Sequence, residues 1–269
     1  MSVSFERTPG KIPHNHDSCK VYPYANGNVE LRTLDKQPTN LTNYRRVGGN
    51  ICVNTSTGEA IECRKTINRS ENSEGMRRSM RYLQLLIAMN FIGNYTELHI
   101  TLTFATAVFV LQTAKSEARK FIARLREKIA PFEYIQITEP REDGSFHIHL
   151  LLKRMDGNIL FIDKSELDRI WGLGSTWVKR LESSVVSGYY FTKPEKQTLL
   201  HFYPAHSRIF TCSRGIQKVE PLKMPYAEAK SLLEEYVLVS SVTTHIMNNN
   251  EDGSKTELNA ITYEKYHPG

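Results

Sequence analysis

Several familiar sequence signals are missing from this chain of 269 residues, and each absence narrows its possible functions. No apolar run approaches the ~20 residues that a membrane-spanning helix needs, so the sequence predicts no such helix. Residues 1–8 lack the apolar core of a signal peptide, which makes the cytosol the expected compartment. No Gly-x-x-x-x-Gly-Lys-Ser/Thr motif occurs, so we expect no P-loop helicase within the chain.

Cysteine is scarce as well, and no two cysteines form a Cys-x-x-Cys pair. The four cysteines are Cys19, Cys52, Cys63 and Cys212. Their number and spacing favour unpaired, reduced thiols in a cytosolic protein. The alternative is a zinc site made by the first three cysteines with His14 or His16, although their spacing fits no common zinc motif.

Positive charge is in moderate excess. Lysine and arginine number 35 against 29 aspartates and glutamates, which gives a net charge of +6 and a pI of about 9.0. This balance favours a polyanionic partner, with nucleic acid as the first choice. Candidate contacts to DNA phosphates are Lys120, Arg124, Arg208 and Arg214. Binding through such residues is expected to weaken as salt rises.

Apolar periodicity divides the chain into three predicted parts. Residues 1–75 are rich in Asn, Thr, Ser, Gly and Pro, which predicts a loop-rich accessory extension or a partly disordered arm. Residues 76–245 carry regular helix and strand patterns and form the predicted catalytic domain. Residues 246–269 have the composition of a polar, mobile C-terminal tail.

Strand and helix patterns alternate within the middle part. Strands are predicted near residues 98–104, 132–139, 145–153 and 177–181, and helices near residues 76–91, 115–129, 165–171, 187–193 and 226–237. This succession predicts an α+β fold with a central antiparallel sheet flanked by helices. Trp171 and Trp177 are expected in its core rather than as platforms for nucleic-acid bases.

The most informative segment is Phe146–Leu152, in which two histidines flank one isoleucine and lead into an aliphatic run. Because side chains alternate along a strand, His147 and His149 point from the same face. If the preceding turn is centred on Asp143, Glu139 lies directly opposite His147 and shares that face. The resulting carboxylate and imidazole set suits Mn²⁺ or Mg²⁺, with Zn²⁺ as an alternative in vitro.

A tyrosine lies downstream of these ligands. Tyr190 and Lys193 are three residues apart, so they share one face if residues 187–193 are helical. Attack of a phenol on a phosphodiester beside a metal would leave a phosphotyrosine and a free hydroxyl, from which the strand can be rejoined. Lys193 would then stabilise the phenolate or the charge that develops on the phosphate.

These motifs and their order resemble those of HUH endonucleases of the rolling-circle replication initiator type, from plasmids and small phages. The family's first motif is an apolar strand, here residues 99–104, and its second is His147-Ile148-His149. The third is Tyr-x-x-Lys, here Tyr190 to Lys193, and members often carry a glutamate eight residues before the first histidine, where Glu139 lies. Shorter similarities occur at Ile170-Trp171-Gly172 and Ser213-Arg214-Gly215, and the resemblance covers about residues 96–217.

The resemblance implies a ferredoxin-like palm that nicks and joins single-stranded or hairpin origin DNA through a covalent 5′-phosphotyrosine. It also implies a separate helicase and the cytoplasm of a bacterial host. The chain departs from the family at Pro194, where many relatives continue with Lys-Tyr, so Tyr189 is a second candidate nucleophile. It also lacks the Cys-Pro-x-Cys knuckle of many plasmid initiators, which leaves the role of residues 1–75 open.

Other functions are compatible with parts of this pattern. A non-catalytic nucleic-acid-binding module would use the same sheet but would not need the histidines and the tyrosine. A metal phosphodiesterase would use water as its nucleophile. A conjugative relaxase usually has its tyrosine before the histidines, and a single-tyrosine transposase, which shares the order found here, is typically much shorter.

Overall fold

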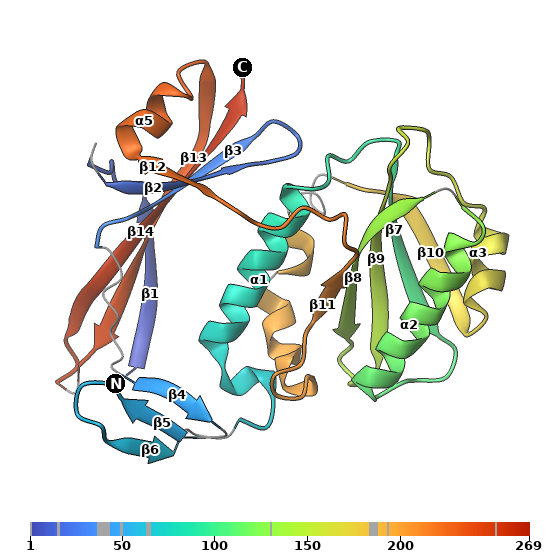
Figure 1. Ribbon diagram of the computed structural model, residues 1–269, viewed down its shortest axis with the longest axis horizontal. Helices are drawn as coiled ribbons and strands as arrows, with labels where there is room; N and C mark the ends of the chain where they lie inside the picture. Colours follow the sequence, from blue (N-terminus) through green and yellow to red (C-terminus); the bar gives the residue numbers. More distant parts are fainter. Residues whose placement is uncertain are drawn as a thin grey trace. The chain divides into compact units, whose positions relative to one another are not determined.

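The chain forms two compact units, each of which has its own sheet. The computed structural model describes residues 2–14, 17–36, 44–48, 51–62, 66–129, 131–182, 188–192, 194–250 and 252–269 (Figure 1). The first unit combines Met1–Lys65 with Glu220–Gly269, and the second consists of Thr66–Val219. The boundaries expected after residues 75 and 245 are therefore wrong, because segments from both ends of the chain contribute strands to one sheet.

The second unit is built around a five-stranded antiparallel sheet with the strand order β10-β7-β9-β8-β11 (Figure 1). Its strands are β7 (Glu97–Phe104), β8 (Phe132–Pro140), β9 (Phe146–Arg154), β10 (Gly174–Arg180) and β11 (Phe210–Cys212). Four of the five strands were predicted from sequence, whereas the short β11 was missed. The α+β class with an antiparallel sheet flanked by helices is confirmed.

Helices cover both faces of this sheet, and Figure 1 shows α1 and α2 on opposite sides of it. Helices α2 (Leu111–Arg126) and α3 (Lys164–Trp171) pack on the face that carries Ile148 and Leu150. Helix α1 (Ser73–Ala88) packs on the face that carries Leu151. Strand β9 is therefore buried from both sides, which explains its uninterrupted run of three leucines.

Two short 3₁₀ segments follow the last long strand of the unit. They are η2 (Tyr189–Phe191) and η3 (Pro194–Phe202), and a third, η1 (Arg69–Glu71), precedes α1. The α-helix predicted over residues 187–193 is therefore wrong, because the described part of this segment makes only a single 3₁₀ turn. Pro194 accounts for the early end, because proline lacks an N–H group and disfavours the α conformation of the residue before it.

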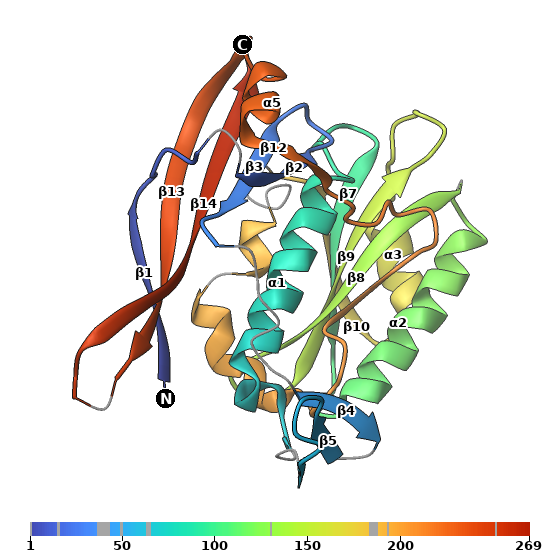
Figure 2. The same ribbon diagram turned by 60° about the vertical axis from the view of Figure 1, so that its left-hand side comes forward.

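The first unit contains a six-stranded sheet with the order β1-β13-β14-β3-β2-β12 (Figure 2). Its strands are β1 (Ser2–Pro9), β2 (Ser18–Pro23), β3 (Val29–Leu34), β12 (Leu222–Pro225), β13 (Tyr236–Asn249) and β14 (Lys255–Pro268). A short helix, α5 (Tyr226–Ser231), contributes Tyr226 and Ala229 to the same core as β2, β3 and β14. A separate three-stranded sheet comprises β4 (Tyr44–Gly48), β5 (Ile51–Asn54) and β6 (Ala60–Glu62).

The predicted polar tail is wrong, because residues 255–268 form a strand with a regular buried face. Ala260, Thr262, Glu264 and Tyr266 alternate along β14 and are all buried. Two of these residues are polar but satisfied: Thr262 shares a hydrogen bond of 2.9 Å with Thr243, and Glu264 accepts one of 3.1 Å from Tyr226. A polar buried face hides the alternation of hydrophobicity on which strand prediction depends.

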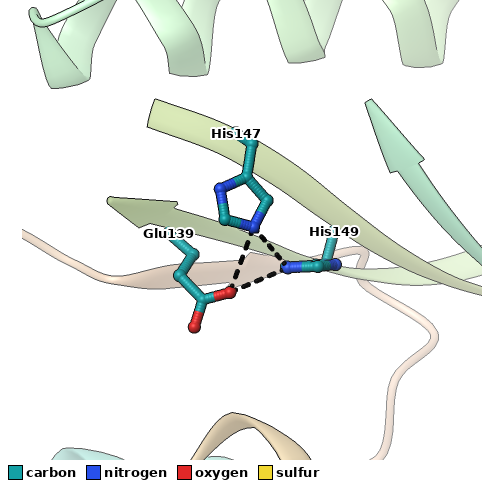
Figure 3. A group of neighbouring side chains, drawn as sticks. All are labelled: Glu139, His147 and His149. Carbon is teal, nitrogen blue, oxygen red and sulfur yellow. Dashed lines mark hydrogen bonds and ion pairs between the residues drawn. The ribbon is translucent and has the colours of Figure 1, made fainter. Parts of the chain in front are cut away.

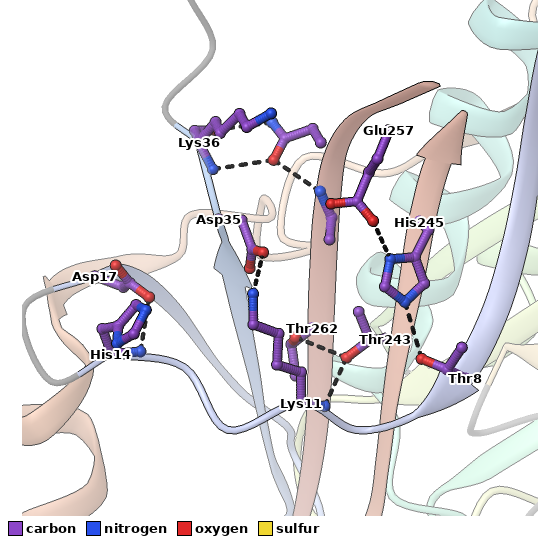
Figure 4. A network of polar contacts seen from close by, with 12 residues as sticks. Thr8, Lys11, His14, Asp17, Asp35, Lys36, Thr243, His245, Glu257 and Thr262 are labelled. Carbon is purple, nitrogen blue, oxygen red and sulfur yellow. Dashed lines mark hydrogen bonds and ion pairs between the residues drawn. The ribbon is translucent and has the colours of Figure 1, made fainter. Parts of the chain in front are cut away.

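Polar contacts also link the strands of the first unit (Figure 4). His245 Nε2 lies 2.9 Å from Thr8 Oγ1, and His245 Nδ1 lies 2.5 Å from Glu257 Oε2. Lys11 pairs with Asp35 at 2.5 Å. Because these groups are largely exposed, we assign them to the register of the strands rather than to much stability.

The cysteines differ from the sequence-based expectation. Cys19 is a free thiol buried in the core of the first unit, and Cys212 is an exposed free thiol. Cys52 is disulfide-bonded, so the prediction that all four cysteines are unpaired is wrong. Among the described residues, no metal-binding group includes a cysteine.

Candidate active site

The β8–β9 hairpin places the three predicted metal ligands. Its turn is stabilised by Asp143, whose side chain accepts a hydrogen bond of 2.9 Å from the backbone N–H of Ser145. Gly144 supplies the left-handed conformation of the turn, with φ of 82°. Glu139 consequently pairs with His147 in the register of the two strands, as predicted from the position of Asp143.

Glu139, His147 and His149 converge on one point above the sheet (Figure 3). Glu139 Oε2 lies 2.8 Å from His149 Nε2 and 3.2 Å from His147 Nε2, and the two imidazole nitrogens are 2.9 Å apart. The side chains of Glu139, His147 and His149 are 12%, 16% and 3% exposed. The group is thus nearly buried but still open to solvent through His147 and Glu139.

The spacing of these atoms fits a divalent cation. Ligands at 2.0–2.1 Å from an octahedral ion are roughly 2.9 Å from their neighbours, whereas tetrahedral ligands at that distance are roughly 3.3 Å apart. The observed separations of 2.8, 2.9 and 3.2 Å are closer to the octahedral value. The group could therefore hold a metal ion and leave positions for water or a phosphate oxygen.

A third histidine lies behind the ligands. His99, on β7, is 3% exposed, and its Nε2 lies 3.0 Å from Nδ1 of His149. Thr101 Oγ1 lies 3.2 Å from the same nitrogen. Sequence reasoning placed His99 and Thr101 on one face of their strand but gave them no role. Contacts to the second nitrogen of a ligand histidine fix its ring orientation and its tautomer.

Tyr190 borders the same cavity as the histidines. The cavity has a volume of about 220 Å³, and its lining comprises His99, Thr101, Thr103, Arg141, His147, His149, Trp177, Lys179 and Tyr190. The Tyr190 ring centroid lies 6.0 Å from that of His149 and 5.9 Å from that of His99, in edge-to-face arrangements. The side chain of Tyr189 and the whole of Lys193 lie outside the described residues, so their roles stay predictions.

The phenol of Tyr190 is poorly suited to ionise without help. Burial raises the pKa of Tyr190 above its ordinary value, and the negative charge of Glu139 raises it further. Lys179 acts in the opposite direction. The phenol is therefore neutral at neutral pH in the arrangement described.

The cations at the cavity are not those predicted from sequence. Arg141 and Lys179 line it, and the structure brings none of Lys120, Arg124, Arg208 and Arg214 into its lining. Lys120 and Arg124 lie on α2, which covers the opposite face of the sheet. The Arg124 guanidinium donates to the backbone oxygens of Ile170 and Trp171 at the end of α3, so we assign it a structural role.

The remaining two predicted DNA contacts lie beside β11, an edge strand of the sheet. Arg208 precedes this strand and Arg214 follows it, and both side chains are exposed. The opposite edge is β10, which carries Trp177 and Lys179. Contacts of Lys120, Arg208 and Arg214 with DNA phosphates therefore stay predictions that concern surfaces outside the cavity.

A close backbone approach positions the tyrosine segment. Gly188 has φ of 69°, and a Cβ atom at this position would lie 2.6 Å from Cα of Gln84 on α1. Gln84 Nε2 also donates a hydrogen bond of 2.9 Å to Thr192 Oγ1, which in turn donates to the Gly188 carbonyl at 3.2 Å. The segment that carries Tyr190 is thus held against α1 only because residue 188 has no side chain.

We expect Gly188→Ala to destabilise the second unit by about 1–3 kcal/mol, from left-handed strain and from the clash with α1. Tyr190 should be displaced, and any activity that depends on it should fall. Gly157→Ala is the matched control, because Gly157 has φ of 76° but no atom within 4 Å of its added Cβ. Urea unfolding of both variants measures the difference, and equal losses of stability would contradict the close-approach explanation.

One comparison with known proteins gives a match. Residues 97–198 match a family described as replication-associated protein, of the ORF2 type, and this segment runs from β7 into η3. It includes Glu139, both ligand histidines and Tyr190. No curated protein and no solved structure matches the chain. Within the described residues, no helix is both long enough and apolar enough to cross a membrane.

Proposed function

We propose that this protein is a replication initiator that nicks and joins single-stranded origin DNA by attack of Tyr190 on the scissile phosphodiester. One observation carries the proposal: Tyr190 and the ligand histidines line one cavity. Arg141 and Lys179 give that cavity a positive rim suited to a phosphate backbone. The match to a family of replication-associated proteins supports a role in DNA replication.

The proposed step exchanges one phosphodiester bond for another. The Tyr190 oxygen forms a bond to phosphorus, the bond between phosphorus and the 3′ oxygen breaks, and the products are a 5′-phosphotyrosine and a 3′-hydroxyl. The phenol proton passes to solvent, and the leaving 3′ oxygen takes up a proton. Mn²⁺ or Mg²⁺ held by Glu139, His147 and His149 would supply Lewis-acid polarisation of the phosphate.

Protein groups around the cavity prepare this step. Lys179 favours the phenolate form of Tyr190, and Arg141 offers a fork of donors for phosphate oxygens. A positive charge at the ligand group would offset Glu139, which otherwise raises the pKa of Tyr190. Because the rejoining reaction is the reverse of nicking, the same residues would serve both directions.

His99 is a positioning residue in this proposal. When Nε2 of His149 binds metal, the proton of its ring lies on Nδ1, which faces His99 and Thr101. We expect His99→Leu to weaken Mn²⁺ binding by about 10- to 100-fold, the usual effect of losing such a contact. Isothermal titration calorimetry checks this expectation. Leu151→Val, a change to a neighbouring buried residue on β9, serves as the control and should leave Mn²⁺ affinity unchanged.

The test of the proposed function uses single-stranded origin DNA labelled at either end, with Mn²⁺. The 3′-labelled strand should migrate with the denatured protein, because its 5′ phosphate is linked to tyrosine. The 5′-labelled fragment should be released with a 3′-hydroxyl that a polymerase can extend. Mass spectrometry of the adduct identifies the linked residue and the position of the cut. Retention of DNA without cleavage would instead indicate a non-catalytic binding module.

The proposal extends to the context of replication. We place the activity at the origin of a plasmid or small phage in the bacterial cytoplasm, with unwinding by a separate helicase of the host. The sequence contains no P-loop motif, which is consistent with this division of labour.

A further inference from the structure

An exposed tryptophan lies at the entrance of the candidate active site. Trp177, on β10, is 64% exposed, although sequence reasoning placed it in the core together with Trp171. Trp171 is indeed buried, at 1% exposure, and donates a hydrogen bond of 2.9 Å to the Thr103 carbonyl. Trp177 instead lines the cavity that contains His149 and Tyr190. Large exposed aromatic rings mark binding surfaces more often than they mark folding constraints.

The register of the sheet fixes the position of this ring relative to the ligand group. Trp177 pairs with Thr101, and Thr101 pairs with His149, so the three residues form one row across the sheet. Two strand spacings separate Trp177 from His149, which corresponds to about 10 Å between their backbones. A ring at that distance can meet the base of a nucleotide whose phosphate lies at the ligand group.

Positive charge accompanies the ring. Lys179 Nζ lies 5.5 Å from the centroid of the Trp177 ring, and Arg141 donates a hydrogen bond of 3.2 Å to Thr103 on the neighbouring strand. An aromatic face flanked by cations is the arrangement by which proteins bind single-stranded nucleic acid without reading its sequence. Duplex DNA does not fit this chemistry, because its bases are already stacked on one another.

We propose that the Trp177 ring stacks on the base of the nucleotide that adjoins the scissile phosphate. The inference rests on the proposed function and identifies its substrate as single-stranded DNA with an unstacked base at this position. Stacking would hold the strand across β10 and β7 and present its phosphate to Tyr190. Because every base has an aromatic face, this contact would tolerate any of the four bases.

Binding without metal tests this inference separately from nicking. In EDTA, we expect a 12-nucleotide oligothymidine to quench the fluorescence of Trp177, while buried Trp171 supplies a constant background. A 12-residue abasic strand with the same backbone should not quench it. Trp177→Ala should weaken oligothymidine binding by about 5- to 150-fold, which corresponds to the 1–3 kcal/mol of one stacked base. The same variant should bind the abasic strand as the unchanged protein does.

The controls separate stacking from general effects on the sheet. Phe161→Ala removes an aromatic ring that is 74% exposed but lies outside the cavity lining, and it should bind both strands normally. Trp177→Phe should retain most of the affinity for oligothymidine. Unchanged binding by Trp177→Ala, or equal weakening towards both strands, would overturn the proposal. Absence of a covalent adduct from the unchanged protein with Mn²⁺ would overturn the proposed function but not the stacking result.

Discussion

Tyr190→Phe is expected to lower the rate of covalent adduct formation by roughly 10³-fold or more, the scale seen when enzymes lose a nucleophile. The change removes one hydroxyl and keeps the ring that contacts His149 and Phe191. The ligand group and the cavity should therefore persist, and binding of uncleaved DNA should change little. The measurement is the fraction of 3′-labelled strand linked to protein over time at saturating Mn²⁺.

Tyr189→Phe is the matched control for this result, since it removes the same hydroxyl one residue earlier. Adduct formation by Tyr189→Phe should stay close to that of the unchanged protein. The reverse outcome would make Tyr189 the nucleophile and exclude Tyr190. Cleavage that survives in the double variant, without an adduct, would show that water attacks and that the protein is a phosphodiesterase.

His149→Ala is expected to remove the stabilisation that Mn²⁺ gives to the second unit. At a Mn²⁺ concentration 100-fold above its Kd, the unchanged protein should gain about 2.7 kcal/mol of stability, which raises its melting temperature by several degrees. Loss of a central ligand leaves only His147 and Glu139, so this gain should vanish, and nicking should vanish with it. The melting temperature with Mn²⁺ is compared with that in EDTA for each variant.

Comparison with EDTA matters because His149 is 3% exposed on its side chain, and its removal alone should lower stability. His201→Ala is the control, since His201 is exposed and its Nδ1 lies 2.8 Å from the nearby Thr198 carbonyl, away from the ligand group. This variant should keep the full response to Mn²⁺. A response that is equally large in His149→Ala would show that the ion binds elsewhere.

The second unit was largely predictable because its sequence patterns have a single interpretation. The β8–β9 hairpin follows from Asp143, Gly144 and the alternation of residues around them, so the facing of Glu139 and His147 could be derived before any coordinates. Helix α2 was equally clear from its apolar stripe, which includes Phe121 and Leu125. Local signals and the global fold agree in these elements.

The first unit was not predictable because its pairings connect segments that are distant in sequence. The polar buried face of β14, with Thr262 and Glu264, conceals a strand, and no local signal joins it to β3. At the site, Trp177 was assigned to the core because tryptophan is usually buried, whereas its position on an edge strand leaves it exposed. Lys179 could have been found from the same alternation that places Trp177 beside Thr101.

The sheet assembled from both ends of the chain has a consequence for synthesis on the ribosome. Ser4 donates a hydrogen bond to Asn249, 245 residues later, so β1 leaves the ribosome long before its partner β13 exists. All strand pairings of the second unit, by contrast, lie within Thr66–Val219 and are available earlier. We therefore expect folding to proceed from the middle of the nascent chain outwards, with the N-terminal strands unpaired until translation is nearly complete.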